Sequence, residues 1–275
     1  MTISRRLALG WASALAVTGG TAHMSVASVL KSAARNASAA LAPRRAPQTA
    51  QRFVELLIHR DEAGHMPFTT ELSIAAPDTA WYAVDTLDST AYRFSNTHYK
   101  KHGYRLRRVS SFMTRHGVRY AAIWEQAPGP EWHSVHGVRH SEFLRNSAEY
   151  ARKGFRLAFV DVRQDYAAIW EAGDPGTQQV FTAITADELK QQLGTLASQG
   201  YRPARISGAA EDGTSRFAAI FEKDSRGAWQ AHIQLNHADF NRMSAHLKAQ
   251  GYRLTDASGH MVNRKPVFSG IWQTA

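Results

Sequence analysis

One short motif recurs four times in this chain and constrains its fold more than any other feature. The tripeptide Gly-(Tyr/Phe)-Arg begins at Gly103, Gly154, Gly200 and Gly251, and the flanking sequence repeats in register with it. An aromatic-Ala-Ala-Ile-aromatic-Glu hexad follows at 120–125, 166–171 and 217–222, and the variant Phe-Ser-Gly-Ile-Trp-Gln follows at 268–273. Self-similarity of this kind indicates tandem repeats, in which each repeat is one supersecondary unit. The repeat predicts how the units stack, but it does not indicate what chemistry the protein performs.

The spacing inside the period is nearly constant. A tryptophan position stands 22 residues before each glycine, occupied by Trp81, Trp132, Gln178 and Trp229. The last hexad residue stands 22 residues after the glycine in units one, three and four, but only 17 residues after it in unit two. Unit two is therefore predicted to have a shortened loop within an unchanged frame.

Each unit is predicted to contain one helix and about three short strands. Ahead of the glycine, apolar residues recur at helical spacing, as at Leu189, Leu193 and Leu196. The segment Thr185-Ala-Asp-Glu188 resembles a capping box, and the glycine stands where a helix end favours a left-handed residue. The segment after the glycine, the hexad and the Trp segment read as strands. The predicted fold class is α+β, with antiparallel strands in tandem repeats that form an open solenoid or a closed ring.

These patterns divide the chain into three parts. An export signal is predicted at 1–30, a disordered linker rich in Ala, Arg and Pro at 31–51, and a repeat domain at 52–275. The repeat domain is predicted to consist of a degenerate cap at 52–80 and of units at 81–131, 132–177, 178–228 and 229–275. The cap begins with a strand at Arg52-Phe53-Val54 and lacks a helix, since Pro43 and Pro47 make the preceding stretch a poor one.

The first residues have the layout of a secretory signal. Ser4-Arg5-Arg6-Leu7 precedes an apolar stretch that ends near Val17 and is followed by small residues. The paired arginines resemble a twin-arginine signal, and an ordinary secretion signal is the alternative. The apolar stretch is shorter than the roughly 20 residues that span a membrane, so no transmembrane anchor is expected in the mature chain. The predicted location is periplasmic or secreted.

The composition excludes several kinds of functional site. The chain contains no cysteine, which excludes disulfides, a thiolate nucleophile and a cysteine-based zinc site. Stability is therefore expected to come from packing, with the seven Trp, nine Tyr and twelve Phe as core residues at the repeated positions. The alternative is that these aromatics form a groove that stacks against a glycan.

The formal net charge of +10 raises the question of an anionic partner. Five arginines gather on the hairpin of unit one, at positions 105, 107, 108, 115 and 119. Part of the excess lies in the signal and linker, and an exported protein seldom meets nucleic acid, so an anionic envelope polymer remains the alternative partner. The arginine two places after each glycine recurs with the hexad acid, which predicts a structural Arg–Glu pair across neighbouring strands.

No catalytic, cofactor or metal residues are assigned from the sequence. His98/His102, His133/His136 and His136/His140 have suggestive spacings but lack a third ligand. Ser28-Val29-Leu30-Lys31 matches a Ser-x-x-Lys pattern, but it lies in the signal region without its companion motifs, and we interpret it as coincidence. Nucleotide-binding glycine loops are absent from the sequence.

A resemblance follows from these residues. Gly-Tyr-Arg, a strand, Arg-Tyr-Ala-Ala-Ile-Trp-Glu at 119–125, a Trp and a helix leading to the next Gly-Tyr-Arg resemble the bacterial tandem repeat domain that also occurs in polyglycine hydrolases. The resemblance spans roughly 81–275. In polyglycine hydrolases, which are secreted proteases, the repeats accompany a separate beta-lactamase-like domain that carries the nucleophile. The resemblance therefore implies an architecture and secretion, and no catalytic residue has a matching position in this chain.

Two functions are consistent with the sequence. The first is an exported non-catalytic binding or scaffold protein that recognises a protein or an envelope polysaccharide, through the hairpin tips at 111–118 and 209–215. The second is a secreted, peptidase-like hydrolase with a site built from residues that break the repeat. Those residues are His133, His136, Asp161, Asp165 and His260, and a cleft joining them is the expected sign of such a site.

Overall fold

The computed structural model describes residues 52–54, 70–72, 81–114, 116–163, 165–224 and 227–274. All of them belong to one compact unit, Ala46–Ala275. The predicted export signal, the predicted linker and Ser28 lie outside the described residues, as does most of the predicted cap. Within the described part, no helix has the length and apolarity needed to cross a membrane.

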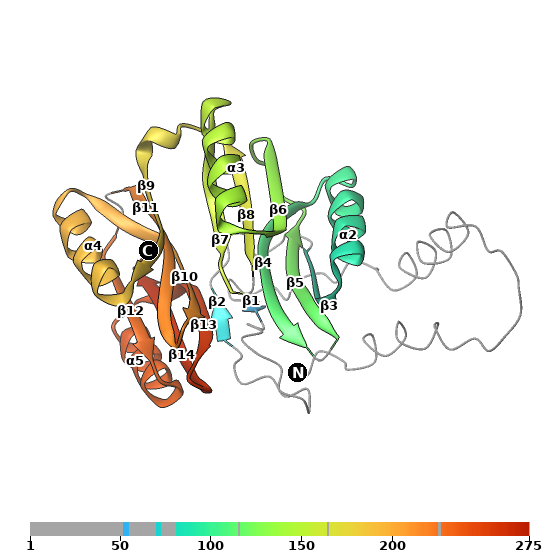
Figure 1. Ribbon diagram of the computed structural model, residues 1–275. Coiled ribbons are helices and arrows are strands. Elements are labelled where there is room, and N and C mark those ends of the chain that lie inside the picture. Colours follow the sequence, from blue (N-terminus) through green and yellow to red (C-terminus); the bar gives the residue numbers. More distant parts are fainter. Residues whose placement is uncertain are drawn as a thin grey trace, which may run out of the picture. The chain divides into compact units, whose positions relative to one another are not determined.

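Four successive segments repeat the same element order, which confirms the predicted α+β tandem repeat (Figure 1). Unit one contains β3 (Trp81–Leu87), α2 (Ser89–Lys101), β4 (Arg105–Thr114) and β5 (Gly117–Glu125). Unit two contains β6 (Trp132–Val138), α3 (His140–Arg152), β7 (Phe155–Asp161), β8 (Tyr166–Ala172) and the short η3 (Pro175–Thr177). Unit three contains β9 (Gln178–Thr185), α4 (Ala186–Ser198), β10 (Tyr201–Glu211) and β11 (Thr214–Lys223). Unit four contains β12 (Trp229–Leu235), α5 (His237–Ala249), β13 (Arg253–Val262) and β14 (Lys265–Gln273).

Each unit forms one antiparallel three-stranded sheet with the hexad strand in the middle. The strand orders are β3-β5-β4, β6-β8-β7, β9-β11-β10 and β12-β14-β13. Ahead of them, β1 (Arg52–Val54) and β2 (Thr70–Leu72) pair antiparallel. Figure 1 shows β4, β7, β10 and β13 in the middle of the repeat domain, with α2, α4 and α5 at its periphery. The strand that follows the glycine is therefore the one that meets the other units.

The helix ends follow the predicted chemistry. Thr185 accepts a hydrogen bond from the Glu188 backbone N–H, and the Glu188 carboxylate accepts one from the Thr185 backbone N–H, which completes the capping box. All four motif glycines adopt the left-handed conformation just beyond the helix, with φ between +78° at Gly154 and +85° at Gly251. A side chain with a Cβ is strained at this φ, so glycine ends the helix with the least backbone cost.

The hairpin between the second and third strand of each unit also matches the sequence. Asp212-Gly213 and Asn263-Arg264 both have positive φ at the two central positions, which defines tight two-residue turns. In unit two, β7 ends at Asp161 and β8 begins at Tyr166, so the missing residues shorten this hairpin. The predicted binding tips are mostly strand, and their Ser111, Phe112 and Ser215 side chains are buried.

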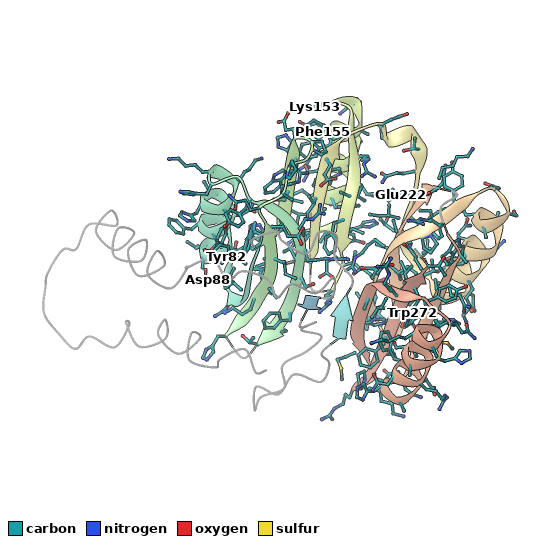
Figure 2. The ribbon with its side chains drawn as sticks, turned by 180° about the vertical axis from the view of Figure 1, so that it is seen from behind. Tyr82, Asp88, Lys153, Phe155, Glu222 and Trp272 are labelled. Atoms are coloured by element: carbon teal, nitrogen blue, oxygen red, sulfur yellow. The ribbon has the colours of Figure 1, made fainter. Side chains whose placement is uncertain are left out.

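The hexads supply the core on both faces of each sheet. In unit three, Phe217 and Phe221 pack against Leu189 of α4, whereas Ala218 and Ile220 pack into the core of unit two. The fifth hexad residue is 0–1% exposed in every unit, at Trp124, Trp170, Phe221 and Trp272, the last of which is labelled in Figure 2. These rings therefore stabilise the fold, and the alternative of a glycan-stacking groove at the hexad aromatics is wrong.

The fourth unit contacts the first. Ile123 of unit one packs against the core cluster of unit four, and the Arg108 guanidinium donates to Asp256 of β13 at 2.5 Å. The carbonyl of Thr255 accepts a second bond from Arg108 at 3.1 Å. Side-chain contacts therefore link unit four to unit one, while the described strands of the two units belong to separate sheets.

Candidate functional site

Charged residues from all four units meet in a central cluster, and Arg163 of unit two also pairs with Asp161 there. Arg108 of unit one, Asp161 of unit two, Arg205 of unit three and Asp256 of unit four form what we call the central charged cluster. Arg205 is 3% exposed and donates to Asp256 at 2.7 Å and to Asp161 at 3.3 Å. It also donates to the carbonyls of Val160 and Ala257. A single side chain therefore connects units two, three and four.

A β-bulge places three of these four residues. In all four units the pairing of the post-glycine strand with the hexad strand shifts by one residue, at Arg107, Ala158, Ala204 and Thr255. A bulge adds a residue that bends the strand and redirects its side chains. The next residue in units one, two, three and four is Arg108, Phe159, Arg205 and Asp256. Phe159 lies between the two arginines, 5.3 Å from the Arg108 guanidinium and 4.4 Å from that of Arg205.

The bulged positions of three units line a cleft of about 290 Å³. We call it the arginine-lined cleft; its walls are Leu106, Arg107, Arg108, Arg156, Ala158, Phe159, Ile169, Glu171, Ala204 and Arg205. Arg107, Arg108 and Arg156 are 23–34% exposed, so they are accessible at its surface. Burial lowers the pKa of Arg108, Asp256 opposes this change, and the neighbouring Arg205 guanidinium adds to it. The pKa shift therefore comes mainly from burial, and the neighbouring arginines add to it.

Carboxylates from outside the cleft hold two of these guanidiniums. Arg107 donates through Nε to Glu125 at 2.9 Å, and Arg156 donates through Nη1 to Glu222 at 2.5 Å (Glu222 is labelled in Figure 2). Glu171 is the carboxylate in the cleft wall itself and accepts from Arg105 at 2.8 Å. The cleft is therefore a rigid arrangement of arginines rather than a set of mobile surface chains.

The predicted Arg–Glu pair forms, but with a different partner. Arg105 and Glu125 are register partners on neighbouring strands, yet the Arg105 guanidinium pairs with Glu171 of the next unit. Arg156 likewise pairs with Glu222 of the next unit. The equivalent arginine of unit three is Arg202. Because Gln273 replaces the acid in the next unit, unit four, Arg202 pairs with Asp224 at 3.2 Å instead. The shortest of these pairs therefore join consecutive units. The expected pair within one sheet forms in unit two, where Arg156 also lies 3.7 Å from Glu171, its register partner.

Neither described cleft joins the residues proposed for a hydrolase, although Asp161 and Asp165 lie close enough for their charges to interact. His136 contacts the Tyr120 ring at 4.8 Å, and the Tyr120 hydroxyl donates to Asp165 at 2.7 Å. Asp161 belongs to the central charged cluster. His133 lies elsewhere, 3.1 Å from Glu131 and stacked on Tyr150. None of the five lines the arginine-lined cleft or the second cleft described below.

His260 does form a pair with a serine that the sequence did not indicate. Its Nε2 lies 2.8 Å from the Ser215 hydroxyl, but Ser215 is 2% exposed and His260 is 5% exposed. Burial, aided by the charge of Arg163, lowers the pKa of His260 to about 4. The imidazole has the neutral form that a general base requires, but a substrate has no access to the hydroxyl. The pair therefore has a structural role.

The histidine pairs considered for a metal are explained by local contacts. His102 donates through Nδ1–H to the His98 carbonyl over 2.8 Å, and His136 Nε2 lies 2.9 Å from the Ser89 hydroxyl. His140 Nε2 lies 3.0 Å from the Thr182 hydroxyl. Over the part of the chain that the structure describes, no three His, Asp or Glu residues are grouped closely enough to hold a metal ion.

A second cleft of about 240 Å³ lies where unit two meets unit three. Its walls include Ser147 and Trp170, and the Ser147 hydroxyl and the Trp170 indole N–H are buried without a hydrogen-bond partner. In unit one, the corresponding Trp124 donates to Asn96 at 3.0 Å, and Asn96 donates to Ser134 of the next unit at 3.1 Å. The link of unit one is therefore not repeated beside the second cleft, where Ser147 stands at the position of Asn96.

Ser147→Asn is expected to raise the free energy of unfolding by about 1 kcal/mol, because the amide would supply the acceptor that Trp170 lacks. Urea unfolding followed by Trp fluorescence measures this. Asn96→Ser is the matched control in unit one and should lower stability by a similar amount. Equal loss of stability in both variants would show that the second cleft cannot accept the longer side chain.

The sequence indicated part of the arginine-lined cleft. Arg107 and Arg108 belong to the arginines noticed on the first hairpin, of which Arg115 lies outside the described residues and Arg119 donates to the Val118 carbonyl. Arg205 and Glu171 were missed as cleft residues. Aligning the fifth residue after each glycine, which reads Arg, Phe, Arg, Asp, would have marked the position as one that departs from the repeat.

The comparison with protein families agrees with the geometry. A family model described as polyglycine hydrolase-like, structural repeat, matches residues 78–127, 129–173, 176–224 and 226–275. These four matches follow the four sheets in order and together cover more than half of the chain. The chain belongs to the polyglycine hydrolase-like structural repeat family.

Proposed function

We propose that this protein is an exported, non-catalytic binding module that recognises a protein or an envelope polysaccharide. The observation that carries the proposal is the arginine-lined cleft, which three consecutive units build from equivalent positions. Repeat arrays commonly bind through surfaces shared by several units. The buried Ser215–His260 pair, which lacks access for a substrate, favours binding over the alternative of a hydrolase.

The first test is a capture experiment with the purified chain against envelope fractions and secreted proteins, run beside a peptidase and glycosidase screen of the same sample. Selective capture without turnover supports the binding module. Turnover that survives repurification would replace the proposal with the hydrolase.

Export is a separate part of the proposal and rests on Arg5-Arg6 and the apolar stretch after them. Cell fractionation tests it directly, since an exported chain is recovered outside the cytoplasm in a form shortened by removal of the signal. Recovery of the uncut chain in the cytoplasm alone would contradict export while leaving the binding test unaffected.

A further inference from the structure

We propose that the arginine-lined cleft binds one oxyanion group, a carboxylate or a phosphate, on the ligand of this protein. The inference rests on the proposed binding function and adds the chemistry of the ligand. It concerns a site that the repeat architecture alone does not require, because the bulged residues Ala158 and Ala204 differ from Arg107 at the same position.

The charge of the cleft wall favours an anion. Four arginines and one glutamate line it; Arg108 and Arg205 pair with Asp256, and Arg205 also pairs with Asp161, neither of which is part of the wall. The carboxylates that pair with Arg107 and Arg156, Glu125 and Glu222, are not part of the wall. Clefts lined by one sign of charge focus the electric field and concentrate ions of the opposite sign.

The donors of the cleft are positioned before a ligand arrives. A guanidinium has five N–H donors in a rigid fork, which suits the two oxygens of a carboxylate or phosphate. Arg107 is held through Nε by Glu125, and Arg156 is held through Nη1 by Glu222. A side chain fixed by one carboxylate loses less conformational entropy when it binds a second anion.

Glu171 shows that a carboxylate fits among these arginines. One of its oxygens lies 2.8 Å from Arg105 and 4.0 Å from Arg107, and the other lies 3.7 Å from Arg156. The wall also contains the small side chains of Ala158 and Ala204, which leave the volume of about 290 Å³ open. That volume is at the lower end of the range for ligand pockets, so it suits one charged group with its immediate substituent.

The test uses the full chain, with inorganic phosphate and D-galacturonate as probes in isothermal titration calorimetry at low salt. We expect at least one probe to bind and its affinity to fall with added salt, because the attraction is screened. Arg156→Gln is expected to weaken binding at least ~10-fold, as charge-assisted hydrogen bonds are among the strongest that a side chain makes. Arg242→Gln removes the same charge from an exposed site on α5 and should leave binding unchanged.

A second variant is expected to change the affinity for the probes in the opposite direction. Glu171→Gln removes the negative charge from the wall while keeping an acceptor for Arg105, so it is expected to tighten binding several-fold. Partial unfolding cannot mimic a gain in affinity. Phosphate binding tighter than galacturonate indicates a phosphorylated ligand, and the reverse order indicates a carboxylated one.

The inference is overturned if neither probe binds, if Arg156→Gln binds as the unaltered chain does, or if Glu171→Gln fails to gain affinity. These results are separate from the capture experiment. A partner captured equally well by the unaltered chain and by Arg156→Gln, with no oxyanion bound, would retain the binding function and reject this site. An oxyanion bound in the cleft without any captured partner would retain the site and reject the proposed function.

Discussion

Replacing Arg205 by methionine is expected to lower the free energy of unfolding by about 3–5 kcal/mol, as found when one partner of a buried ion pair is removed. The guanidinium is 3% exposed and donates to Asp161, Asp256 and two backbone carbonyls in neighbouring units. Arg108 still pairs with Asp256 and Arg163 with Asp161 in the variant, so the loss comes mainly from the hydrogen bonds that Arg205 itself makes in a water-poor interior. Urea unfolding at neutral pH measures the change.

Two further variants show whether the loss of stability arises from the bonds that Arg205 makes between units. Arg205→Lys keeps the charge but has fewer donors in a different geometry, and it should fall between the unaltered chain and Arg205→Met. Arg242→Met removes an arginine whose side chain is 76% exposed on α5, and it should change stability little. A loss below about 1 kcal/mol for Arg205→Met would mean that the central charged cluster rearranges without it, which contradicts its role as the link between units.

The repeat itself could be predicted because the same residue types recur at the same positions of each unit. The glycines at positive φ and the aromatic hexads recur at fixed spacing, and the Thr185 capping box of unit three depends on contacts within that unit. A signal that appears four times in register is hard to produce by chance. For this reason, the helix ends, the order of helices and strands along the chain, and the core positions could all be predicted from the sequence.

The contacts between units could not be predicted in the same way. The bulged residue is Arg107, Ala158, Ala204 or Thr255, so no residue type marks the bulge. The arginine-lined cleft depends on these bulges and on side chains far apart in the chain. The Arg105 pair was assigned to its cross-strand neighbour because strand register predicts that contact, whereas Glu171 of the next unit lies closer to the guanidinium.

Acidification from pH 7 to pH 5 is expected to destabilise the fold by about 2 kcal/mol through His260 alone, since its folded pKa of about 4 lies below the usual value of 6.5. The unfolded chain takes up a proton as the pH falls through 6.5, and the folded chain does not until about pH 4. Stability from the neutral imidazole is therefore complete above pH 6.5, declines between pH 6.5 and 4, and does not decline further below that range. Burial also lowers the pKa of His136 to about 4, which adds to the effect in the same range.

The pH dependence can be separated from other acid effects by the variant His260→Gln. Glutamine keeps a polar group near the Ser215 hydroxyl but does not titrate, so the change in unfolding free energy between pH 7 and 5 should shrink by about 2 kcal/mol, whatever the variant's stability at pH 7. His246→Gln, at an exposed position on α5, is the matched control and should leave the pH dependence unaltered. Asp165 acts in the opposite direction, because burial raises its pKa and protonation then favours the folded state. An unchanged pH dependence in His260→Gln would mean that the pKa of His260 is the same in the folded and unfolded chains, which contradicts a neutral imidazole held in the core.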